Sequence, residues 1–347
     1  MIVSGFEGTC LNHEIEKLIA EQGIGGLILF ERNYENPKQL KKLIKDLQAI
    51  RPKHSPPLFI SVDQEGGRVL RLKEPFTQFP PMCCLGQADS DDLAYHFGLG
   101  MGKEMKAVGI NMDYAPVLDV HSNPNNPIIG QRAISSDPLK VARLGCKIIQ
   151  GFKDAGVFPV GKHFPGHGDT SQDSHLTLPK VEKGQESLTQ VELIPFVKAF
   201  QEGLEIIMTA HVVYPALDET SAATFSNIIL KNLLRDKMGF KGLVMSDDLE
   251  MQAVTQTIEE IPALAINAGV DLFLICHDIT KVIQLQETLI KDVEMGKLSQ
   301  RDIDGAHQRI IKTKQKLAKF MDDEVVLEAI LEDNLKLAEE MRSHLLE

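Results

Sequence analysis

Residues able to perform chemistry gather in one short segment, "GKHFPGHGDTSQDSHLTLP" at 161–179, which contains three histidines and two aspartates. The prolines and glycines among them prevent a continuous helix. Imidazole and carboxylate groups would therefore stand on a stiff loop, which suits a metal centre, an acid–base site or a merely polar loop.

The metal hypothesis depends on His163 and His167, which are four residues apart. Histidines at this spacing share one face of a helix and can bind zinc there. Because "HFPGH" cannot be helical throughout, the spacing of four residues does not indicate a zinc site here. We expect no metal and no cofactor, and a metal-dependent barrel hydrolase stays as an alternative.

The acid–base hypothesis depends on Asp173 and His175, two residues apart in the same loop. A carboxylate bonded to one imidazole nitrogen fixes the tautomer and raises the basicity of the other nitrogen. Such a histidine can donate a proton and later accept one near neutral pH. The alternative is a polar loop with local turn bonds, and we expect His167 to form hydrogen bonds within this loop.

A second chemical motif is "GLVMSDDLEM", an apolar run that ends in Asp247 and Asp248. Side chains alternate along a strand, so the two carboxylates face opposite sides. We expect one to point into the active site as a nucleophile and the other to cap the following helix. The alternative is that both are caps or solvated.

A third group has the composition of a site for a polyhydroxylated ligand. Carboxylates accept hydrogen bonds from neighbouring hydroxyls, and Arg, Lys or His side chains donate to others. Each such residue alone is more often part of a salt bridge. The candidates are Asp63, Glu65, Arg68 and Arg71 in "SVDQEGGRVLRL", Arg132 in "NPIIGQRAI", and Lys162 and His163.

These side chains follow a recurrent unit, in which a helix-like segment ends near Gly and an apolar run comes next. The runs predict eight strands, within 2–8, 21–30, 58–65, 107–120, 154–164, 201–214, 237–248 and 267–278. Helical patterns cover 37–50, 90–108, 138–155, 188–202 and 258–268, and 299–347 predicts two further helices. This alternation predicts an α/β fold, a (β/α)₈ TIM barrel, with a doubly wound sheet as the rival. Polar residues favour the barrel because they come at or just past the carboxyl ends of the strands, which converge on one face. They are Asp63, Asp119, His163, His211, Asp247 and His277.

Composition limits the classes of function. The net charge of −12 and the absence of a long basic run argue against nucleic acid or an anionic membrane as a partner. The five cysteines match no zinc or redox motif, so we expect reduced thiols. Without a visible signal peptide or transmembrane run, we expect a cytoplasmic protein of one domain, residues 1–347.

The motifs taken together resemble the β-N-acetylglucosaminidases of glycoside hydrolase family 3, in their compact bacterial form. The resemblance is carried by "DQEGGRVLR", "NPIIGQR", "GKHFPGHGDTSQDSHLTLP" and "SDDLEM", in this order, and runs from about Ile2 to Asp278. One departure is Ile134 in "GQRAISSDP", where an aromatic residue often stands.

The resemblance implies a retaining exo-glycosidase that removes terminal N-acetylglucosamine from peptidoglycan fragments (muropeptides) in cell-wall recycling. It implies Asp247 as nucleophile and His175 as acid/base, oriented by Asp173. The positions that match its sugar-binding residues are Asp63, Arg71, Arg132, Lys162 and His163.

Other activities stay open beside this one. They are a β-glucosidase or β-xylosidase of the same family, the metal-dependent hydrolase, and a barrel that binds sugar without cleaving it. Because neutral imidazole does not repel an anion, phosphate is a hypothetical acceptor beside water.

Overall fold

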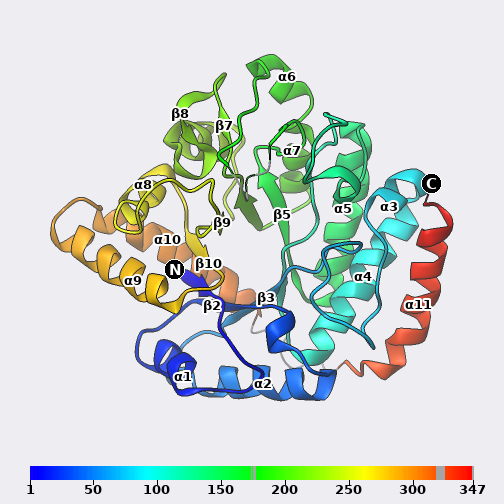
Figure 1. Ribbon diagram of the computed structural model, residues 1–347, viewed down its shortest axis with the longest axis horizontal. Coiled ribbons are helices and arrows are strands. Elements are labelled where there is room, and N and C mark those ends of the chain that lie inside the picture. Colours follow the sequence, from blue (N-terminus) through cyan, green and yellow to red (C-terminus); the bar gives the residue numbers. More distant parts are fainter. Residues whose placement is uncertain (173, 175–176, 318–324, 346–347) are drawn as a thin grey trace.

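The structure, a computed structural model, describes residues 1–172, 174, 177–317 and 325–345. Within these ranges, parallel strands close into an eight-stranded barrel in the order β1–β10–β9–β6–β5–β4–β3–β2 (Figure 1). The strands are β1 Ile2–Ser4, β2 Gly26–Leu29, β3 Phe59–Val62, β4 Met112–Asp113, β5 Phe158–Phe164, β6 Ile206–Thr209, β9 Leu243–Asp248 and β10 Leu272–Ile275. Each lies inside one of the eight predicted runs, and the predicted TIM barrel is confirmed.

Helices surround the barrel (Figure 1). The α-helices are α1 His13–Ala20, α2 Pro37–Ala49, α3 Cys83–Ala88, α4 Asp91–Val108, α5 Pro138–Ala155, α6 Gln185–Gln190, α7 Ile194–Gln201, α8 Ile261–Ala268, α9 Ile279–Glu294, α10 Gln300–Leu317 and α11 Glu328–Ser343. Short 3-10 helices are η1 Glu31–Asn33, η2 Gly130–Arg132 and η3 Ala223–Phe225, and η4 Ile228–Lys237 is a π-helix. None of the helices in the described ranges has the length and apolar character needed to cross a membrane.

Capping residues explain where the helix α5 begins and ends. The Asp137 side chain accepts a hydrogen bond from the Leu139 amide, and Pro138 occupies the first turn, where no amide donor is needed. Gly156 ends the helix with φ of 81°, a conformation that costs glycine little. The chain then turns directly into β5, which carries Lys162 and His163.

Glycines let α4 and α5 approach closely. A Cβ atom on Gly98 would lie 2.3 Å from the Ile148 carbonyl oxygen, and one on Gly151 would lie 2.2 Å from the Tyr95 carbonyl oxygen. Larger residues at either position would push the helices apart. The close contact fixes the wall behind β4 and β5.

The barrel interior is filled with apolar side chains and closed below by α10. The cluster includes Val3, Ile28, Phe59, Met112, Tyr114, Phe158, Val160, Ile206, Met208, Leu243, Met245, Leu272 and Leu274, with Ile310 and Leu317 from α10. Lys314 of α10 donates to the Gly25 carbonyl, and its Nζ lies 4.8 Å from the centre of the Phe59 ring. The end of the barrel opposite the polar strand ends is therefore sealed.

The last helix, α11, packs along α4 and against α3 (Figure 1). Asn334 reaches into this interface, where its Nδ2 donates to Glu104 Oε1 at 2.7 Å and to the Gly100 carbonyl at 3.1 Å. The buried Glu104 also accepts from the Thr77 amide at 2.9 Å. A polar contact thus sits inside an otherwise apolar interface.

Two predicted elements differ from the structure. The predicted helix over 188–202 is two helices, because Val191 has non-helical backbone angles and Pro195 has no amide to continue the ladder. The apolar run over 201–214 is not one strand. It ends as β6 at Thr209, and 213–214 forms β7, which pairs antiparallel with β8 Asp218–Ala222.

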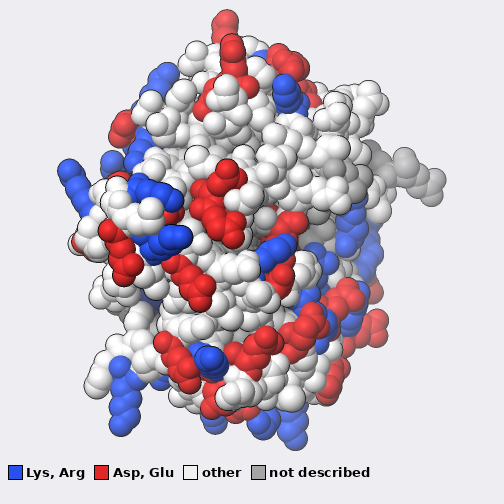
Figure 2. Space-filling model, turned by 60° about the vertical axis from the view of Figure 1, so that its left-hand side comes forward, with Lys and Arg blue, Asp and Glu red and all other residues white. Residues whose placement is uncertain are grey.

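The molecular surface carries charges of both signs. Acidic and basic side chains are interspersed over the face shown in Figure 2, with uncharged areas between them.

Candidate active site

A cavity of about 540 Å³ opens at the carboxyl ends of the barrel strands. Six of the predicted site residues line it: Asp63, Arg71, Arg132, Lys162, His163 and Asp247. They come from β5 and β9 and from the loops after β3 and β4, so the barrel brings together positions up to 184 residues apart. The predicted Asp173 and His175 lie outside the described residues, but Ser174, which stands between them, lines the same cavity.

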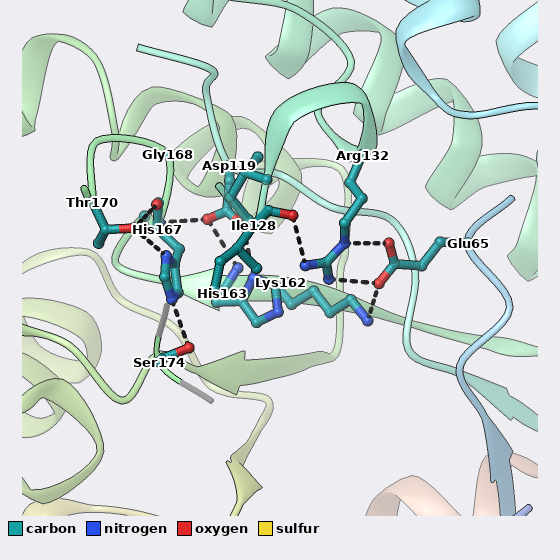
Figure 3. A network of polar contacts seen from close by, with 12 residues as sticks. Glu65, Asp119, Ile128, Arg132, Lys162, His163, His167, Gly168, Thr170 and Ser174 are labelled. Carbon is teal, nitrogen blue, oxygen red and sulfur yellow. Dashed lines mark hydrogen bonds and ion pairs between the residues drawn. The ribbon is translucent and has the colours of Figure 1, made fainter. Parts of the chain in front are cut away.

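Glu65 joins the basic residues at the floor of the cavity (Figure 3). Arg132 donates to both of its oxygens, through Nε and Nη2, each at 2.8 Å. Lys162 Nζ lies 2.6 Å from Glu65 and 2.6 Å from Asp63. Arg71 lies 4.0 Å from Asp63. The floor is a buried array of alternating charges.

These charges hold each other ionised despite their burial. Burial alone would raise the pKa of Glu65, but Arg132 and Lys162 lower it below its ordinary value. Burial alone would lower the pKa of Lys162, but Asp63 and Glu65 raise it. The site therefore presents fixed carboxylate acceptors and cationic donors, the complement of a ring of hydroxyl groups.

Asp119 positions His163 and His167 (Figure 3). Its Oδ2 lies 2.7 Å from His163 Nδ1, and its Oδ1 accepts from the amides of His163 and His167 at 3.1 and 2.6 Å. Burial would raise the pKa of Asp119, but the neighbouring His163 lowers it. Because Asp119 engages Nδ1, the other nitrogen of His163 is the one left for a ligand.

His167 binds within the loop, as predicted. Its Nε2 lies 3.0 Å from Ser174 Oγ, and its Nδ1 lies 2.9 Å from Thr170 Oγ1. Burial, together with the charge of His163, lowers the pKa of His167 to about 4, so its ring is neutral at physiological pH. Asn126 donates to the His167 and Gly168 carbonyls and thereby fixes the base of the loop.

The two carboxylates that end β9 both line the cavity. Asp247 follows the inward-facing Leu243 and Met245, and its Oδ1 accepts from the Asp248 amide at 2.8 Å. Its Oδ2 accepts no hydrogen bond from a described residue. Burial would raise the pKa of Asp247, but His163 and His211 lower it, so it is an anion with one oxygen free.

Asp248 differs from its predicted role. No helix begins after it, because residues 249–253 form turns and α8 starts only at Ile261. The Asp248 side chain accepts instead from the amides of Glu250 at 3.1 Å and Cys276 at 3.3 Å. Burial, with smaller contributions from Glu250 and Asp247, raises its pKa to about 7. Neighbouring carboxylates thus differ in protonation.

His211 contacts the backbone at the end of β9. Its Nε2 donates to the Asp248 carbonyl at 3.1 Å, and its Nδ1 lies 2.8 Å from Thr224 Oγ1. Burial lowers the pKa of His211 below its ordinary value. A neutral ring therefore bridges β9 and the segment after β8.

The rim of the cavity includes an aromatic platform. Phe30 stacks on His277 with ring centres 5.4 Å apart, and Arg32 covers the Phe30 ring at 4.4 Å. Arg32 also ties this rim to the segment after β1, because its Nε donates to the Phe6 carbonyl. Sequence reasoning noted His277 as a residue at a strand end but missed Phe30, which sits in an unremarkable apolar run.

Asp119 was also recognised only as a polar residue at a strand end. Its partner His163 is 44 positions away, and their contact follows from the register of β4 beside β5, which sequence periodicity does not show. Among the residues that the structure describes, no group of three or more His, Cys, Asp or Glu side chains has an arrangement that could hold a metal ion.

Known proteins are similar to this chain in sequence and in fold. The model of the glycosyl hydrolase family 3 N-terminal domain matches residues 3–313. Beta-hexosaminidase A of Pseudoalteromonas piscicida is 38% identical over 337 residues, which are 89% of this chain but only 56% of that protein. The beta-hexosaminidase of Idiomarina loihiensis is 39% identical over 284 residues, 80% of this chain and 84% of that protein.

A solved structure agrees with these relatives. The family 3 beta-N-acetylglucosaminidase of Paenibacillus sp. FPU-7 superposes with a TM-score of 0.93 at 38% identity, covering 99% of this chain and 67% of that one. The family model matches most of the chain, and the Idiomarina loihiensis relative, most of whose length is covered, is 39% identical over the aligned residues. The chain therefore belongs to glycosyl hydrolase family 3, a family of enzymes that hydrolyse glycosidic bonds.

Proposed function

We propose that this protein is a retaining exo-β-N-acetylglucosaminidase that removes terminal N-acetylglucosamine from peptidoglycan fragments in the cytoplasm. Residues 1–347 would act as one catalytic barrel. The observation that carries the proposal is the free, ionised Asp247 in a cavity whose floor is lined by Asp63, Lys162 and Arg132. The names of the relatives support the choice of the sugar.

In the first step, Asp247 Oδ2 attacks the anomeric carbon and forms a covalent glycosyl–enzyme bond, while the bond to the leaving oxygen breaks. His175, oriented by Asp173, donates its proton to that oxygen. In the second step, His175 takes a proton from water, and the water oxygen replaces Asp247 at the anomeric carbon. The position of Ser174 at the cavity supports this assignment for its two neighbours.

The remaining groups would bind the terminal sugar. Asp63 accepts hydrogen bonds from hydroxyl groups, and Lys162, Arg71 and Arg132 donate to them, as does His163 through its free nitrogen. The buried array fixes these groups before the sugar arrives, so little ordering is required on binding. The low pKa of Asp247 keeps the nucleophile charged throughout the neutral range.

Hydrolysis of 4-nitrophenyl β-N-acetylglucosaminide tests the proposal. We expect Asp247→Ala to lose at least about 10³-fold in kcat, because the covalent route is removed. His175→Ala should lose less, since 4-nitrophenolate departs with little protonation. Asp236→Ala, an exposed carboxylate on η4, is the matched control. Equal and small losses in the Asp247 and His175 variants would contradict the assigned roles.

Further measurements separate the alternatives. Retention predicts that the β-anomer appears first in proton NMR, and a 5-fluoro glycosyl fluoride should label the peptide that contains Asp247. Faster turnover of 4-nitrophenyl β-glucoside or β-xyloside would favour those activities, and loss of turnover with a chelator would favour a metal. Product analysis in phosphate buffer distinguishes free sugar from sugar phosphate.

A further inference from the structure

Among the described residues, the lysine and arginines that line the cavity are matched by carboxylates, except for Arg68. Lys162 and Arg132 contact Glu65 at 2.6 and 2.8 Å, and Arg71 lies 4.0 Å from Asp63. Arg68 also lines the cavity, yet it contacts no carboxylate among the residues that the structure describes. An arginine carries five N–H donors, and within the described part of the chain this one uses a single donor, in a bond to the Ile128 carbonyl.

The surroundings of that carbonyl add a second observation. The Ile128 oxygen also accepts from Arg132 Nη1, at 3.4 Å, as Figure 3 shows. Two guanidinium groups thus converge on one uncharged acceptor, and their like charges repel. Glu65 neutralises Arg132 through a bidentate contact, but nothing described neutralises Arg68. An anion beside Arg68 would complete the pattern of alternating charge.

The depth of each residue indicates which part of a substrate would supply this anion. The side chains of Glu65 and Lys162 are only 1% and 3% exposed at the floor, whereas Arg68 is an exposed residue at the rim. An exo-acting glycosidase admits the terminal sugar first, so this sugar occupies the floor. The leaving group then faces the rim, where Arg68 lies.

We propose that Arg68 binds a carboxylate on the leaving group and thereby selects acidic saccharides as substrates. The inference rests on the proposed glycosidase function and adds a specificity residue to it. Carboxylate is the anion that a guanidinium recognises with paired hydrogen bonds, and the unused donors of Arg68 permit such a pair. Because Arg68 is partly solvated, we expect a preference of about tenfold rather than the larger factor of a buried pair.

The test uses two substrates that differ only in this charge: N-acetylglucosaminyl-β-1,4-N-acetylmuramic acid and its methyl ester. The released N-acetylglucosamine is measured, and kcat/KM for the acid is divided by kcat/KM for the ester. We expect a ratio of about ten for the wild type. For Arg68→Gln it should fall to about one, and for Arg68→Lys, which keeps the charge but not the fork, it should lie between. Arg301→Gln, an exposed arginine on α10, serves as control and should keep the wild-type ratio.

Two results would overturn the inference. One is a wild-type ratio near one. The other is an Arg68→Gln variant in which both substrates slow by the same factor, so that the ratio persists. That outcome would mean that Arg68 serves only to hold the Ile128 carbonyl. The proposed glycosidase function is tested separately, because 4-nitrophenyl β-N-acetylglucosaminide carries no carboxylate and its hydrolysis by the wild type does not depend on this ratio.

Discussion

The charge array at the cavity floor leads to a quantitative prediction for Glu65→Gln. Glu65 is almost fully buried and receives three charged contacts, two from Arg132 at 2.8 Å and one from Lys162 at 2.6 Å. The substitution keeps the shape of the side chain but removes its charge. Arg132 then loses its carboxylate partner, while Lys162 keeps its contact with Asp63.

The magnitude follows from the cost of leaving buried charge unpaired. Removing one partner of a buried ion pair costs about 3–5 kcal/mol. Asp63 compensates part of this loss, so we expect the free energy of unfolding to fall by about 3 kcal/mol. If the same amount is lost from the ordering of the sugar-binding groups, kcat/KM falls about 100-fold, since 1.36 kcal/mol is a factor of ten.

Urea unfolding and 4-nitrophenyl β-N-acetylglucosaminide hydrolysis, both at pH 7, measure the two effects. Glu332→Gln is the matched control, because it breaks an exposed pair with Lys336 on α11 and should leave stability and activity essentially unchanged. A Glu65→Gln variant as stable and as active as this control would refute the view that Glu65 orders the floor.

Three further predictions concern the supports of the site. Burial and the charge of His163 lower the pKa of His167 to about 4, so its neutral form stabilises the native state above pH 6.5, and this stability is lost as the pH falls. Between pH 7.5 and pH 5, we expect the free energy of unfolding in urea to fall by about 2 kcal/mol more for the wild type than for His167→Gln. Equal decreases in the two proteins would contradict this. Burial raises the pKa of Glu192 to about 7 although it accepts from Ser122 at 2.7 Å, so native stability is lost as the pH rises from about 4.5 to 7. Glu192→Gln should therefore be more stable than the wild type by up to about 3 kcal/mol at pH 8, with little difference at pH 4.5; a pH-independent effect would indicate another cause. Asn126→Ala should lose about 3 kcal/mol of unfolding free energy in the same measurement, because several buried hydrogen bonds at the base of the His167 loop are removed together. A loss below about 1 kcal/mol would show that the loop is held by other contacts.

The barrel could be predicted from the sequence because its signals are local. Each strand is a short apolar run that follows a glycine, as in 154–164, where Gly156 ends α5 just before β5. Alternation along the strand from Leu243 predicted only that one of Asp247 and Asp248 faces the barrel mouth, and the choice of Asp247 came from the family resemblance. Family membership and glycosidase class were predicted from long joint motifs, and both are confirmed.

Other features depend on contacts that periodicity does not encode. The antiparallel pair β7–β8 was missed because Val212 and Val213 continue the apolar run of β6, although the backbone turns after Thr209. The floor array could be foreseen as a set of polar residues, but the sequence does not show which acid pairs with which base. Glu65 was thus one candidate among several, while the structure makes it the partner of both Lys162 and Arg132.

The buried amide of Asn334 has a consequence for the last helix. Apolar side chains alone would tolerate sliding α11 along α4 by a turn, about 5.4 Å. Such a slide would take the amide of Asn334 away from the buried Glu104 carboxylate, which would keep only its contacts with Thr77. Asn334 therefore selects one register of α11 against α4 and contributes little to the stability of the interface. A replacement helix grafted onto this surface must carry an amide at the same place, or it will settle in several positions.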